Sequence, residues 1–228
     1  MSMLTEYHCH ILPGIDDGAD SVETAIKMIE RMHEQGVRRI VSTSHFYCHR
    51  EESVEAFIEK RRAAFEALMA AGPAITDIRL GAEIAIEHGV SETPGLDKLA
   101  IAGTDLILME FPYRRFEEWM EGELDNITAK YDLSLIIAHV HRYLDYYTDD
   151  QTENLIELNA ILQVNNEAFE NRKEKKLVKR LIDGDYPLVF GSDAHNNSTR
   201  KPNWDLAKKK LDARTLERSD RMLDRHRI

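Results

Sequence analysis

Short apolar runs alternate with longer amphipathic segments along most of this chain, and this alternation restricts the fold more than any other feature of the sequence. The runs are rich in Val, Ile and Leu, as expected for strands that are covered on both faces. The segments between them carry apolar residues at helical spacing. We therefore predict an α/β fold of about seven β/α units around a parallel sheet that is strongly curved or closed into a barrel.

This pattern assigns each expected element to a residue range. Strands are expected at 4–11, 37–43, 75–82, 105–109, 133–138, 161–164 and 187–190. Helices are expected at 21–34, 54–71, 116–130, 150–160, 173–183 and 204–211. In folds of this kind, active sites lie at the carboxyl ends of the strands, so residues that follow the apolar runs are the first candidates for function.

The chain is expected to form one domain. Its 228 residues contain no internal repeat, no low-complexity linker and no break in composition. This length is normal for a single α/β barrel. The last segment, 214–228, is strongly charged with sparse apolar positions, which predicts a solvated terminal helix or a frayed tail rather than a functional arm.

Composition excludes several classes of function. With 30 Lys and Arg against 41 Asp and Glu, the formal net charge is −11, which disfavours nucleic acid or an anionic membrane as the main partner. The sequence contains no signal peptide and no run long enough to span a membrane. The only cysteines, Cys9 and Cys48, are too few for a disulfide framework. We therefore expect a cytoplasmic protein without membrane insertion.

Residues that can bind metal ions stand at the ends of the apolar runs. His8 and His10 flank Cys9 in the first run, and Asp193 and His195 follow the last one. Alternate residues of a strand share a face, so each pair would direct two ligands the same way while Cys9 turns to the opposite face. Four further candidates end the intervening runs, namely His45, Glu83, Glu110 and His139. One site assembled from strand ends is the simplest interpretation.

The types of these residues indicate which metal chemistry to expect. Imidazole and carboxylate ligands together suit Zn²⁺, Mn²⁺ or Fe²⁺. The absence of cysteine at the other strand ends argues against a structural thiolate zinc site. A carboxylate such as Glu110 can bridge two ions, and paired ions can clamp an in-line phosphoryl displacement. The pattern therefore favours a hydrolytic metal cluster.

Two loops next to these ligands add candidates. The loop 12–18 brings Asp16 and Asp17 close to His10, although an ordinary turn with a helix cap has the same appearance. Arg142 follows His139 by three positions and could hold a phosphate through a bidentate fork, with a surface ion pair as the alternative.

Other conspicuous residues have simpler explanations. Tyr143, Tyr146 and Tyr147 could line a pocket, or they could pack beneath the loop that carries them. Most remaining histidines are expected at the surface, namely His33, His88 and His226. His49 lies four residues after His45 in a loop, and its role stays open.

Seven motifs, in order along the chain, resemble the PHP (polymerase and histidinol phosphatase) superfamily. They are His8-x-His10, Pro13-Gly-Ile-Asp-Asp-Gly18, Ser42-Thr-Ser-His45, Gly81-Ala-Glu83, Met109-Glu110-Phe111, Ala138-His139-x-x-Arg142-Tyr143 and Gly191-Ser-Asp193-x-His195-Asn196. Within that superfamily the chain is most similar to the bacterial capsule and exopolysaccharide protein-tyrosine phosphatases, and the resemblance extends from about residue 5 to residue 202.

The resemblance implies a fold, a metal centre and a substrate. The fold is a distorted (β/α)7 TIM-like barrel, and the centre holds three divalent metal ions, often manganese, with iron or zinc possible. The implied ligands are His8, His10, Asp17, His45, Glu83, Glu110, His139, Asp193 and His195. Arg142 and Arg200 match the arginines that hold phosphate, with Tyr143 beside them as a substrate-binding candidate. The implied partner is a phosphotyrosine-bearing protein, the tail of a bacterial tyrosine kinase, and an oligomer is a family-level expectation.

Two positions depart from the family pattern. Glu6 stands two residues before the first ligand, where relatives usually have Asp. His141 stands where relatives often carry Glu. Neither change removes an implied ligand, so the second bears on the specificity of the pocket rather than on the metal centre.

The expected reaction is metal-assisted hydrolysis, in which the metal ions hold the phosphate and supply the hydroxide that attacks phosphorus opposite the leaving phenolate. The arginines would stabilise the equatorial charge, and His195 or a metal-coordinated water would act as the acid. A cysteine mechanism is excluded because no Cys-x5-Arg motif occurs, Ile15 and Val54 standing six places after the two cysteines. The alternatives are a histidinol-phosphate or other small-molecule phosphomonoesterase, and a non-catalytic metal-stabilised regulatory module.

Overall fold

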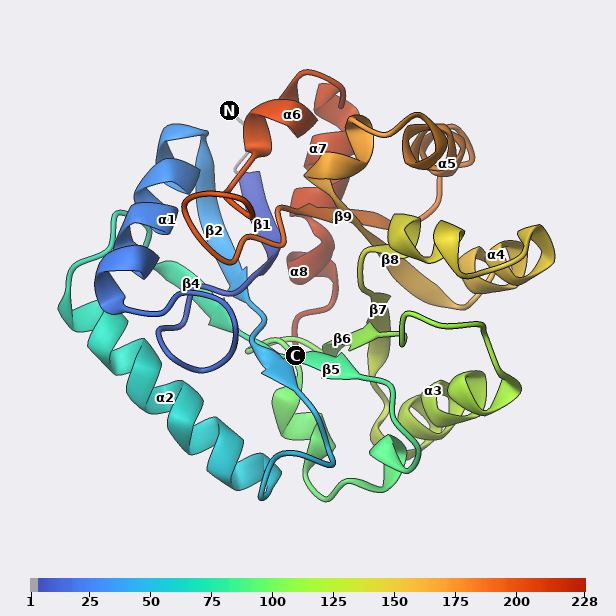
Figure 1. Ribbon diagram of the computed structural model, residues 1–228, viewed down its shortest axis with the longest axis horizontal. Coiled ribbons are helices and arrows are strands. Elements are labelled where there is room, and N and C mark those ends of the chain that lie inside the picture. Colours follow the sequence, from blue (N-terminus) through green and yellow to red (C-terminus); the bar gives the residue numbers. More distant parts are fainter. Residues whose placement is uncertain (1–3) are drawn as a thin grey trace.

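Parallel strands surrounded by helices make up the computed structural model, which describes residues 4–228 (Figure 1). The strands are β1 (Leu4–Cys9), β2 (Val37–Ser42), β3 (His45–Phe46), β4 (Asp77–Leu80), β5 (Glu83–Ala85), β6 (Leu106–Glu110), β7 (Ser134–Ile137), β8 (Ala160–Asn165) and β9 (Leu188–Gly191). The α-helices are α1 (Val22–Glu34), α2 (Val54–Ala70), α3 (Glu118–Tyr131), α4 (Asp149–Ile156), α5 (Arg172–Asp183), α6 (Trp204–Lys208), α7 (Ala213–Asp220) and α8 (Met222–Arg225). Short 3-10 helices are η1 (Val90–Glu92), η2 (Leu96–Leu99), η3 (Val140–Asp145) and η4 (Asn166–Phe169).

The strands follow one another around a ring in sequence order. Hydrogen bonds join them into two parallel sheets, ordered β1-β2-β4 and β3-β5-β6-β7-β8-β9. Two short links join one sheet to the other. Residues 43–44 connect β2 to β3, and residues 81–82 connect β4 to β5. Past the end of β9, His10 N–H donates to Ala194 O at 2.9 Å and Asp193 N–H donates to His8 O at 2.7 Å. These bonds bring the last unit back to β1, and the prediction of seven units in a distorted barrel-like fold is confirmed.

Side-chain caps set the starts of several helices. The Ser21 hydroxyl accepts a hydrogen bond from Thr24 N–H at 3.2 Å at the start of α1, and Ser53 does the same for Ala56 N–H at 3.1 Å at the start of α2. Such bonds satisfy amide groups that have no partner within the helix. Gly36 has a positive φ of 97° directly after α1, a conformation that glycine adopts without steric cost and that turns the chain into β2.

The buried apolar residues form two clusters. The larger one lies between the strands and the surrounding helices, as expected for an α/β barrel. The smaller one includes Leu106 and Leu108, which share a face of β6 with Glu110 and therefore lie inside the ring. Met222 and Leu223 from α8 belong to this inner cluster, although they are distant in sequence from its strand residues. The interior of the barrel is thus apolar below the level of Glu110.

The C-terminal segment corrects one prediction. The segment 214–228 is helical as expected, but it is neither frayed nor fully solvated, since Met222 and Leu223 are each only 5% exposed. The hydroxyl of Tyr7 in β1 donates to Ser219 O at 2.7 Å and accepts from Leu223 N–H at 3.2 Å. The prediction was wrong because charged residues dominate the segment, and the two adjacent apolar residues that close the amino end of the barrel were given too little weight.

Two expected helices end earlier than the sequence pattern suggested. Helix α4 ends at Ile156 instead of residue 160, because Ala160 begins β8 and pairs with Leu135 of β7. Helix α6 ends at Lys208, and Asp212 accepts from Thr215 N–H at 2.7 Å to start α7. Among residues 4–228, no helix is both long and apolar enough to cross a membrane.

Candidate metal centre

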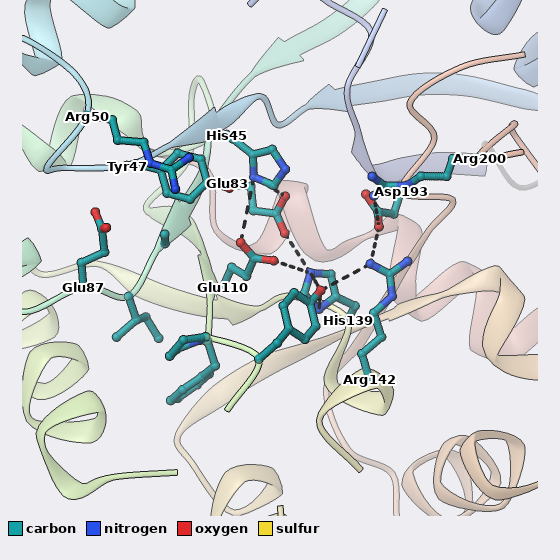
Figure 2. Close-up of a pocket in the computed structure, with 15 residues that line it drawn as sticks. His45, Tyr47, Arg50, Glu83, Glu87, Glu110, His139, Arg142, Asp193 and Arg200 are labelled. Carbon is teal, nitrogen blue, oxygen red and sulfur yellow. Dashed lines mark hydrogen bonds and ion pairs between the residues drawn. The ribbon is translucent and has the colours of Figure 1, made fainter. Parts of the chain in front are cut away.

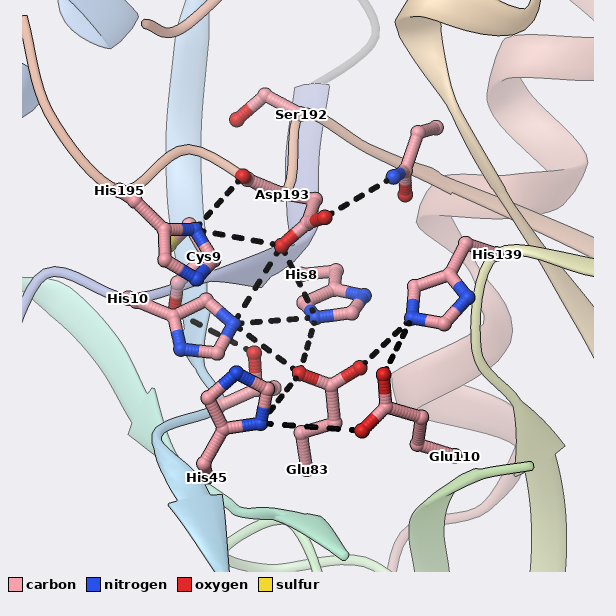
Figure 3. A network of polar contacts seen from close by, with 12 residues as sticks. His8, Cys9, His10, His45, Glu83, Glu110, His139, Ser192, Asp193 and His195 are labelled. Carbon is pink, nitrogen blue, oxygen red and sulfur yellow. Dashed lines mark hydrogen bonds and ion pairs between the residues drawn. The ribbon is translucent and has the colours of Figure 1, made fainter. Parts of the chain in front are cut away.

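Nine side chains that the sequence singled out converge at the carboxyl ends of the strands, and Figure 3 labels all of them except Asp17. They are His8, His10, Asp17, His45, Glu83, Glu110, His139, Asp193 and His195. Three groups of potential ligand atoms lie within 4.8 Å of one another: His10, Asp17, His45 and His195; His8, His10, Glu83 and Asp193; and His45, Glu83 and Glu110. His139 contacts the two carboxylates of the last group, Glu83 and Glu110. The structure therefore brings all nine predicted residues together.

Glu83 lies at the centre of this cluster. Its Oε2 atom is 3.0 Å from His8 Nε2 and 3.2 Å from both His10 Nε2 and His45 Nδ1. Its Oε1 atom is 2.9 Å from His139 Nε2, which is also 3.4 Å from Glu110 Oε1. The carboxylate is 1% exposed and points at four imidazoles, two from the end of β1 and one each from β3 and the end of β7. Such a carboxylate is suited to bridge two cations.

The second half of the cluster is built around Asp193. Its Oδ1 atom is 3.5 Å from the Nε2 atoms of both His8 and His10, and 3.4 Å from His195 Nδ1. Asp17, from the loop after β1, approaches from the solvent side with Oδ1 3.3 Å from His195 Nε2. Asp193 has a positive φ of 48°, so the turn after β9 holds its side chain in an uncommon backbone conformation.

Three imidazoles are oriented by hydrogen bonds on their outer nitrogens. His10 Nδ1–H donates to Asp16 Oδ2 at 2.7 Å, and His8 Nδ1–H donates to Gln163 Oε1 at 3.1 Å. His195 Nδ1–H donates to Asp193 O at 2.9 Å. In each ring this arrangement leaves Nε2 directed into the cluster, as in histidines that bind metals.

The electrostatics of the cluster are those of a site that needs positive charge. Burial favours the neutral form of Glu83, but neighbouring His8 and His10 hold its pKa well below the usual range. Burial has the same effect on Asp193, and His8, His10 and Arg142 keep its pKa well below the usual range too. Burial and the charge of His10 lower the pKa of His195 to about 4, so that imidazole is neutral and free to act as a ligand.

The polar atoms at the centre do not satisfy one another. Among the buried side-chain atoms of residues 4–228 that have no hydrogen-bond partner, three belong to the cluster: His45 Nδ1, Asp193 Oδ1 and His195 Nε2. Buried polar atoms without partners are costly and uncommon in native structures. All three point into the cluster, where cations would bind them. The donor set of imidazoles and carboxylates therefore fits divalent metal ions.

Two arginines face the same carboxylate at the edge of the cluster (Figure 2). Arg142 Nη1 is 2.7 Å and Arg200 Nη2 is 2.9 Å from Asp193 Oδ2. Arg142 is also held by Glu167, whose Oε1 accepts from its Nη2 at 2.6 Å. The guanidinium groups thus flank the position that an anion would occupy next to the cluster, and planar guanidinium groups suit phosphate.

An open cavity of about 480 Å³ leads to the cluster. Its floor includes Glu83, Glu110, His139 and Asp193, and its walls include Tyr47, Ile86, Phe111, Pro112 and Tyr113. The Tyr113 ring stacks on His139 with 5.7 Å between ring centroids and 21° between planes. The volume is ordinary for a small-molecule or side-chain pocket. A flat apolar group attached to an anion matches these walls and this floor.

Tyr143 was predicted to bind substrate, but in the structure it is a packing residue. Its ring is 1% exposed and does not line the cavity. Its hydroxyl accepts from Phe111 N–H at 2.9 Å and so fixes the backbone next to Glu110. Tyr147 packs with it, 5.4 Å between centroids, while Tyr146 is exposed. The aromatic wall was predicted in this region, but Tyr113 supplies it.

Several residues that support the site were missed from the sequence. Gln163 accepts from both His8 and His139, and Glu167 holds Arg142. Asp16 was noted with its loop but only Asp17 was expected to bind metal. The signal for Gln163 was a polar residue inside the apolar run 161–164, which a strand buried on both faces tolerates only when its amide is satisfied.

Glu6, which the sequence resemblance marked as a departure, has a structural role. Its fully buried carboxylate accepts from Ser192 N–H at 2.7 Å, Ser192 Oγ at 2.6 Å and Trp204 Nε1 at 2.7 Å. Burial raises its pKa to about 6, although these donors oppose the shift. Glu6 therefore fixes the turn that presents Asp193 to the first strand.

The remaining sequence candidates lie outside the cluster. His33 and His88 are on the surface side, and the latter stacks on Trp119 with 3.7 Å between centroids. His226 is 3.0 Å from Asp105 at the opposite end of the barrel. Cys9 faces away from the ligands, with Sγ 3.6 Å from Val41 O. His141 is buried and its Nε2 is 3.8 Å from Glu167, behind Arg142 rather than in the cavity.

Comparisons with known proteins agree with this geometry. The family described as "Capsular polysaccharide synthesis, CpsB/CapC" matches residues 4–225. A tyrosine-protein phosphatase CpsB of Streptococcus pneumoniae is 29% identical, and the match covers 92% of each chain. A tyrosine-protein phosphatase YwqE of Bacillus subtilis is 26% identical over 86% of this chain and 79% of its own.

Solved structures show the same fold. A structure from a crystallographic study of YwqE from Bacillus subtilis and CpsB from Streptococcus pneumoniae, described as metal-dependent tyrosine phosphatases, matches with a TM-score of 0.79 at 24% identity and covers 99% of this chain and 96% of its own. The phosphotriesterase homology protein of Escherichia coli, solved with phosphate in its active site, matches with a TM-score of 0.58 at 14% identity over 96% and 97% of the two chains.

Proposed function

Because the chain belongs to the CpsB/CapC family of capsular polysaccharide synthesis, we propose that it is a metal-dependent protein-tyrosine phosphatase. The observation that carries this proposal is the position of the nine-residue cluster at the floor of an aromatic-walled cavity, with two arginines at its edge. The curated relatives named above are tyrosine-protein phosphatases. A phosphorylated phenol fits both the walls and the floor.

The cluster is proposed to hold three divalent metal ions, with Mn²⁺ as the first choice and iron or zinc as alternatives. The three groups of neighbouring ligand atoms support this number. Glu83 belongs to two of the groups, and its carboxylate has two oxygens, so it is the natural shared ligand. Bound ions would polarise the phosphate and provide the nucleophile at neutral pH.

The protein groups around the cavity have separate tasks in this proposal. Arg142 and Arg200 bind the phosphoryl oxygens and stabilise the charge that develops on them. Both guanidinium groups contact Asp193 Oδ2 in the structure. Their N–H groups would therefore donate to a bound phosphate as well as to that carboxylate. Tyr113 and Pro112 would contact the phenyl ring and exclude water from one side. Glu167 holds Arg142 in place from behind and is a positioning residue.

The leaving group sets a modest demand for acid catalysis. A tyrosine phenol has an ordinary pKa of about 10 and therefore leaves more readily than a serine alcohol. His195 is proposed to stand near the leaving oxygen, with its Nδ1–H already donated to Asp193 O. Because Nε2 would bind a cation and burial keeps the ring neutral, His195 is proposed to act as a ligand, and water at the site would supply the proton to the phenolate.

The partner is proposed to be a phosphotyrosine-bearing protein, with the tail of a bacterial tyrosine kinase as the first choice. The cavity is open to the surface, and its volume of about 480 Å³ can hold a side chain presented by a flexible peptide. The reaction is proposed to occur in the cytoplasm, and the free thiols of Cys9 and Cys48 suit a reducing compartment.

A turnover assay with and without metal tests the proposal. The purified protein, treated with a chelator, is expected to lose hydrolysis of an aryl phosphate and to regain it with Mn²⁺. A phosphotyrosyl peptide should be cleaved with a higher kcat/KM than histidinol phosphate, because Tyr113 and Pro112 favour a phenyl ring. Absence of metal-dependent hydrolysis would reject the enzyme, and faster cleavage of histidinol phosphate would reassign the substrate.

A further inference from the structure

A second group of potential metal ligands lies outside the nine-residue cluster. Cys48, His49 and Glu87 each offer a ligand atom, and the three atoms lie within 4.8 Å of one another. Cys48 and His49 belong to the turn after β3, and Glu87 belongs to the turn after β5. Because β3 and β5 are paired in parallel, their following turns emerge side by side.

Backbone hydrogen bonds fix both turns. Arg50 N–H and Glu51 N–H both donate to Tyr47 O, at 3.0 and 3.1 Å, which closes the turn around Cys48 and His49. His49 N–H donates to Glu87 Oε2 at 3.3 Å and so ties the two turns together. The backbone therefore fixes the turn that carries Cys48 and His49, and the His49 amide holds the Glu87 carboxylate next to it.

The imidazole of His49 is already oriented for binding a cation. Its Nε2 is 3.1 Å from His88 O, a carbonyl that can only accept a hydrogen bond. In the neutral ring the proton is therefore on Nε2, and the lone pair is on Nδ1. This is the tautomer that histidine ligands adopt when a backbone carbonyl holds their outer nitrogen.

The charges at this position are incomplete without a cation. Within residues 4–228, no Lys, Arg or His side chain lies within ion-pair distance of Glu87. Burial and the neighbouring carboxylate of Glu87 raise the pKa of Cys48 to about 11, so the thiol is protonated in the metal-free protein. A divalent ion would balance one carboxylate and one thiolate, and the thiol proton would pass to the solvent.

We propose that Cys48, His49 and Glu87 form an open three-ligand site for a thiophilic divalent cation such as Zn²⁺, separate from the nine-residue cluster. Sulfur, nitrogen and oxygen ligands in this ratio suit Zn²⁺ or Co²⁺ better than Mn²⁺, which prefers oxygen. The fourth position faces solvent, since His49 is exposed and the other two side chains are half-buried.

The site lies at the rim of the cavity. Glu87, Tyr47 and Arg50 line the same cavity as Glu83 and Arg142, and Figure 2 shows Glu87 at the side away from the two phosphate-facing arginines. A bound ion would therefore add positive charge where a substrate peptide enters, without replacing any ligand of the nine-residue cluster. The site does not depend on the proposed phosphatase activity, because its ligands are not shared with the cluster.

Cobalt absorption can detect the site in the Mn²⁺-loaded full-length protein. Cobalt bound to a thiolate gives an intense near-ultraviolet charge-transfer band, and no residue of the nine-residue cluster is a cysteine. The band is expected in the wild type and in Cys9→Ala, which is the matched control because Cys9 is fully buried and faces away. The band should disappear in Cys48→Ser, and Zn²⁺ should displace it.

Alkylation and activity provide two further measurements. Zn²⁺ should slow the alkylation of Cys48 by iodoacetamide about tenfold or more, and His49→Gln and Glu87→Gln should each weaken that protection by a similar factor. Cys48→Ser is expected to keep the circular dichroism spectrum of the wild type, which shows that it is folded whether or not the protein is a phosphatase, and to keep the Mn²⁺-dependent turnover of the wild type. A missing band, a band that survives in Cys48→Ser, or alkylation that Zn²⁺ does not slow would each overturn the proposal.

Discussion

The two ends of the barrel are closed in opposite ways. At the carboxyl end, buried imidazoles and carboxylates crowd together, and three of their polar atoms have no hydrogen-bond partner among the described residues. At the amino end, α7 and α8 cover the ring with Met222 and Leu223, and the Tyr7 hydroxyl both donates and accepts a hydrogen bond. Good packing stabilises a fold, whereas unsatisfied groups are tolerated where a ligand binds.

This difference assigns separate consequences to mutations at each end. Changes in the cluster at the carboxyl end should alter metal binding and turnover. Changes under α8 should alter the free energy of unfolding and leave the turnover of folded molecules intact. A variant at either end with the opposite effect would contradict this division of roles.

Glu83→Gln should have the largest effect. Glu83 contacts four imidazoles and is shared by two groups of potential ligands, so its replacement removes the charge that would bridge two ions. We expect kcat/KM for an aryl phosphate to fall by about 10³-fold or more. Elemental analysis should show fewer bound metal ions per chain, with an unchanged circular dichroism spectrum. The exposed Glu92→Gln is the control and should behave like the wild type.

Arg142→Ala and Arg200→Ala should differ in severity. Arg142 contacts both Asp193 and Glu167 and is the less exposed of the two, at 29% against 38%. Its loss should lower kcat/KM by about 100-fold, the cost of removing one donor that stabilises transition-state charge, whereas loss of the more solvated Arg200 should cost about tenfold. Inhibition by inorganic phosphate should weaken in both variants. Equal kcat/KM for Arg142→Ala and the wild type would remove Arg142 from the site.

Strand geometry explains which residues of this site could be predicted from the sequence. Ligands at strand ends are predictable because parallel strands bring their carboxyl ends to one edge, and the nine residues obeyed that rule. Gln163 and Tyr113 were missed because their roles depend on which loop folds over which strand. Tyr143 was assigned to the cavity for the same reason, since nothing in a linear pattern tells a pocket wall from the layer behind it.

The amino end was harder to predict than the carboxyl end. Charged residues dominate 214–228, and only the adjacent Met222 and Leu223 reveal a buried face. Two apolar residues give no helical period, so local pattern cannot tell a docked helix from a solvated one. The partner surface, which includes Tyr7 in β1, is more than 200 residues away in the sequence, as the 212-residue separation between Tyr7 and Ser219 shows.

Leu223→Ala tests whether α8 is part of the core. The side chain is 5% exposed within the inner cluster, so truncation should leave a cavity and lower the free energy of unfolding by about 2–4 kcal/mol. Urea denaturation measures this change, and kcat/KM at low temperature should stay within about twofold of the wild type. Arg225→Ala on the exposed side of the same helix should change stability by less than about 0.5 kcal/mol. Similar losses in both variants would mean that α8 does not pack as described.

Asp220→Asn should have the smallest effect and should depend on pH. Burial raises the pKa of Asp220 to about 6, and the hydrogen bond from Thr5 N–H at 2.7 Å and the charge of Arg39 only partly oppose this. The ordinary pKa is close to 4, so the folded protein binds this proton more tightly than the unfolded chain does. The resulting stabilisation is complete below about pH 4 and is lost as pH rises towards 6.

Asparagine keeps the acceptor for Thr5 N–H and carries no charge. The variant should therefore gain stability relative to the wild type as pH rises from 4 to 6.5, by about 1 kcal/mol once the shift is discounted for solvent screening. Urea midpoints of both proteins across this range give the difference directly, and Glu217→Gln on the exposed face of α7 serves as the control. A constant difference between Asp220→Asn and the wild type would mean that Asp220 is ionised as easily in the fold as in water, and the amino end would then not be as dry as its apolar cluster implies.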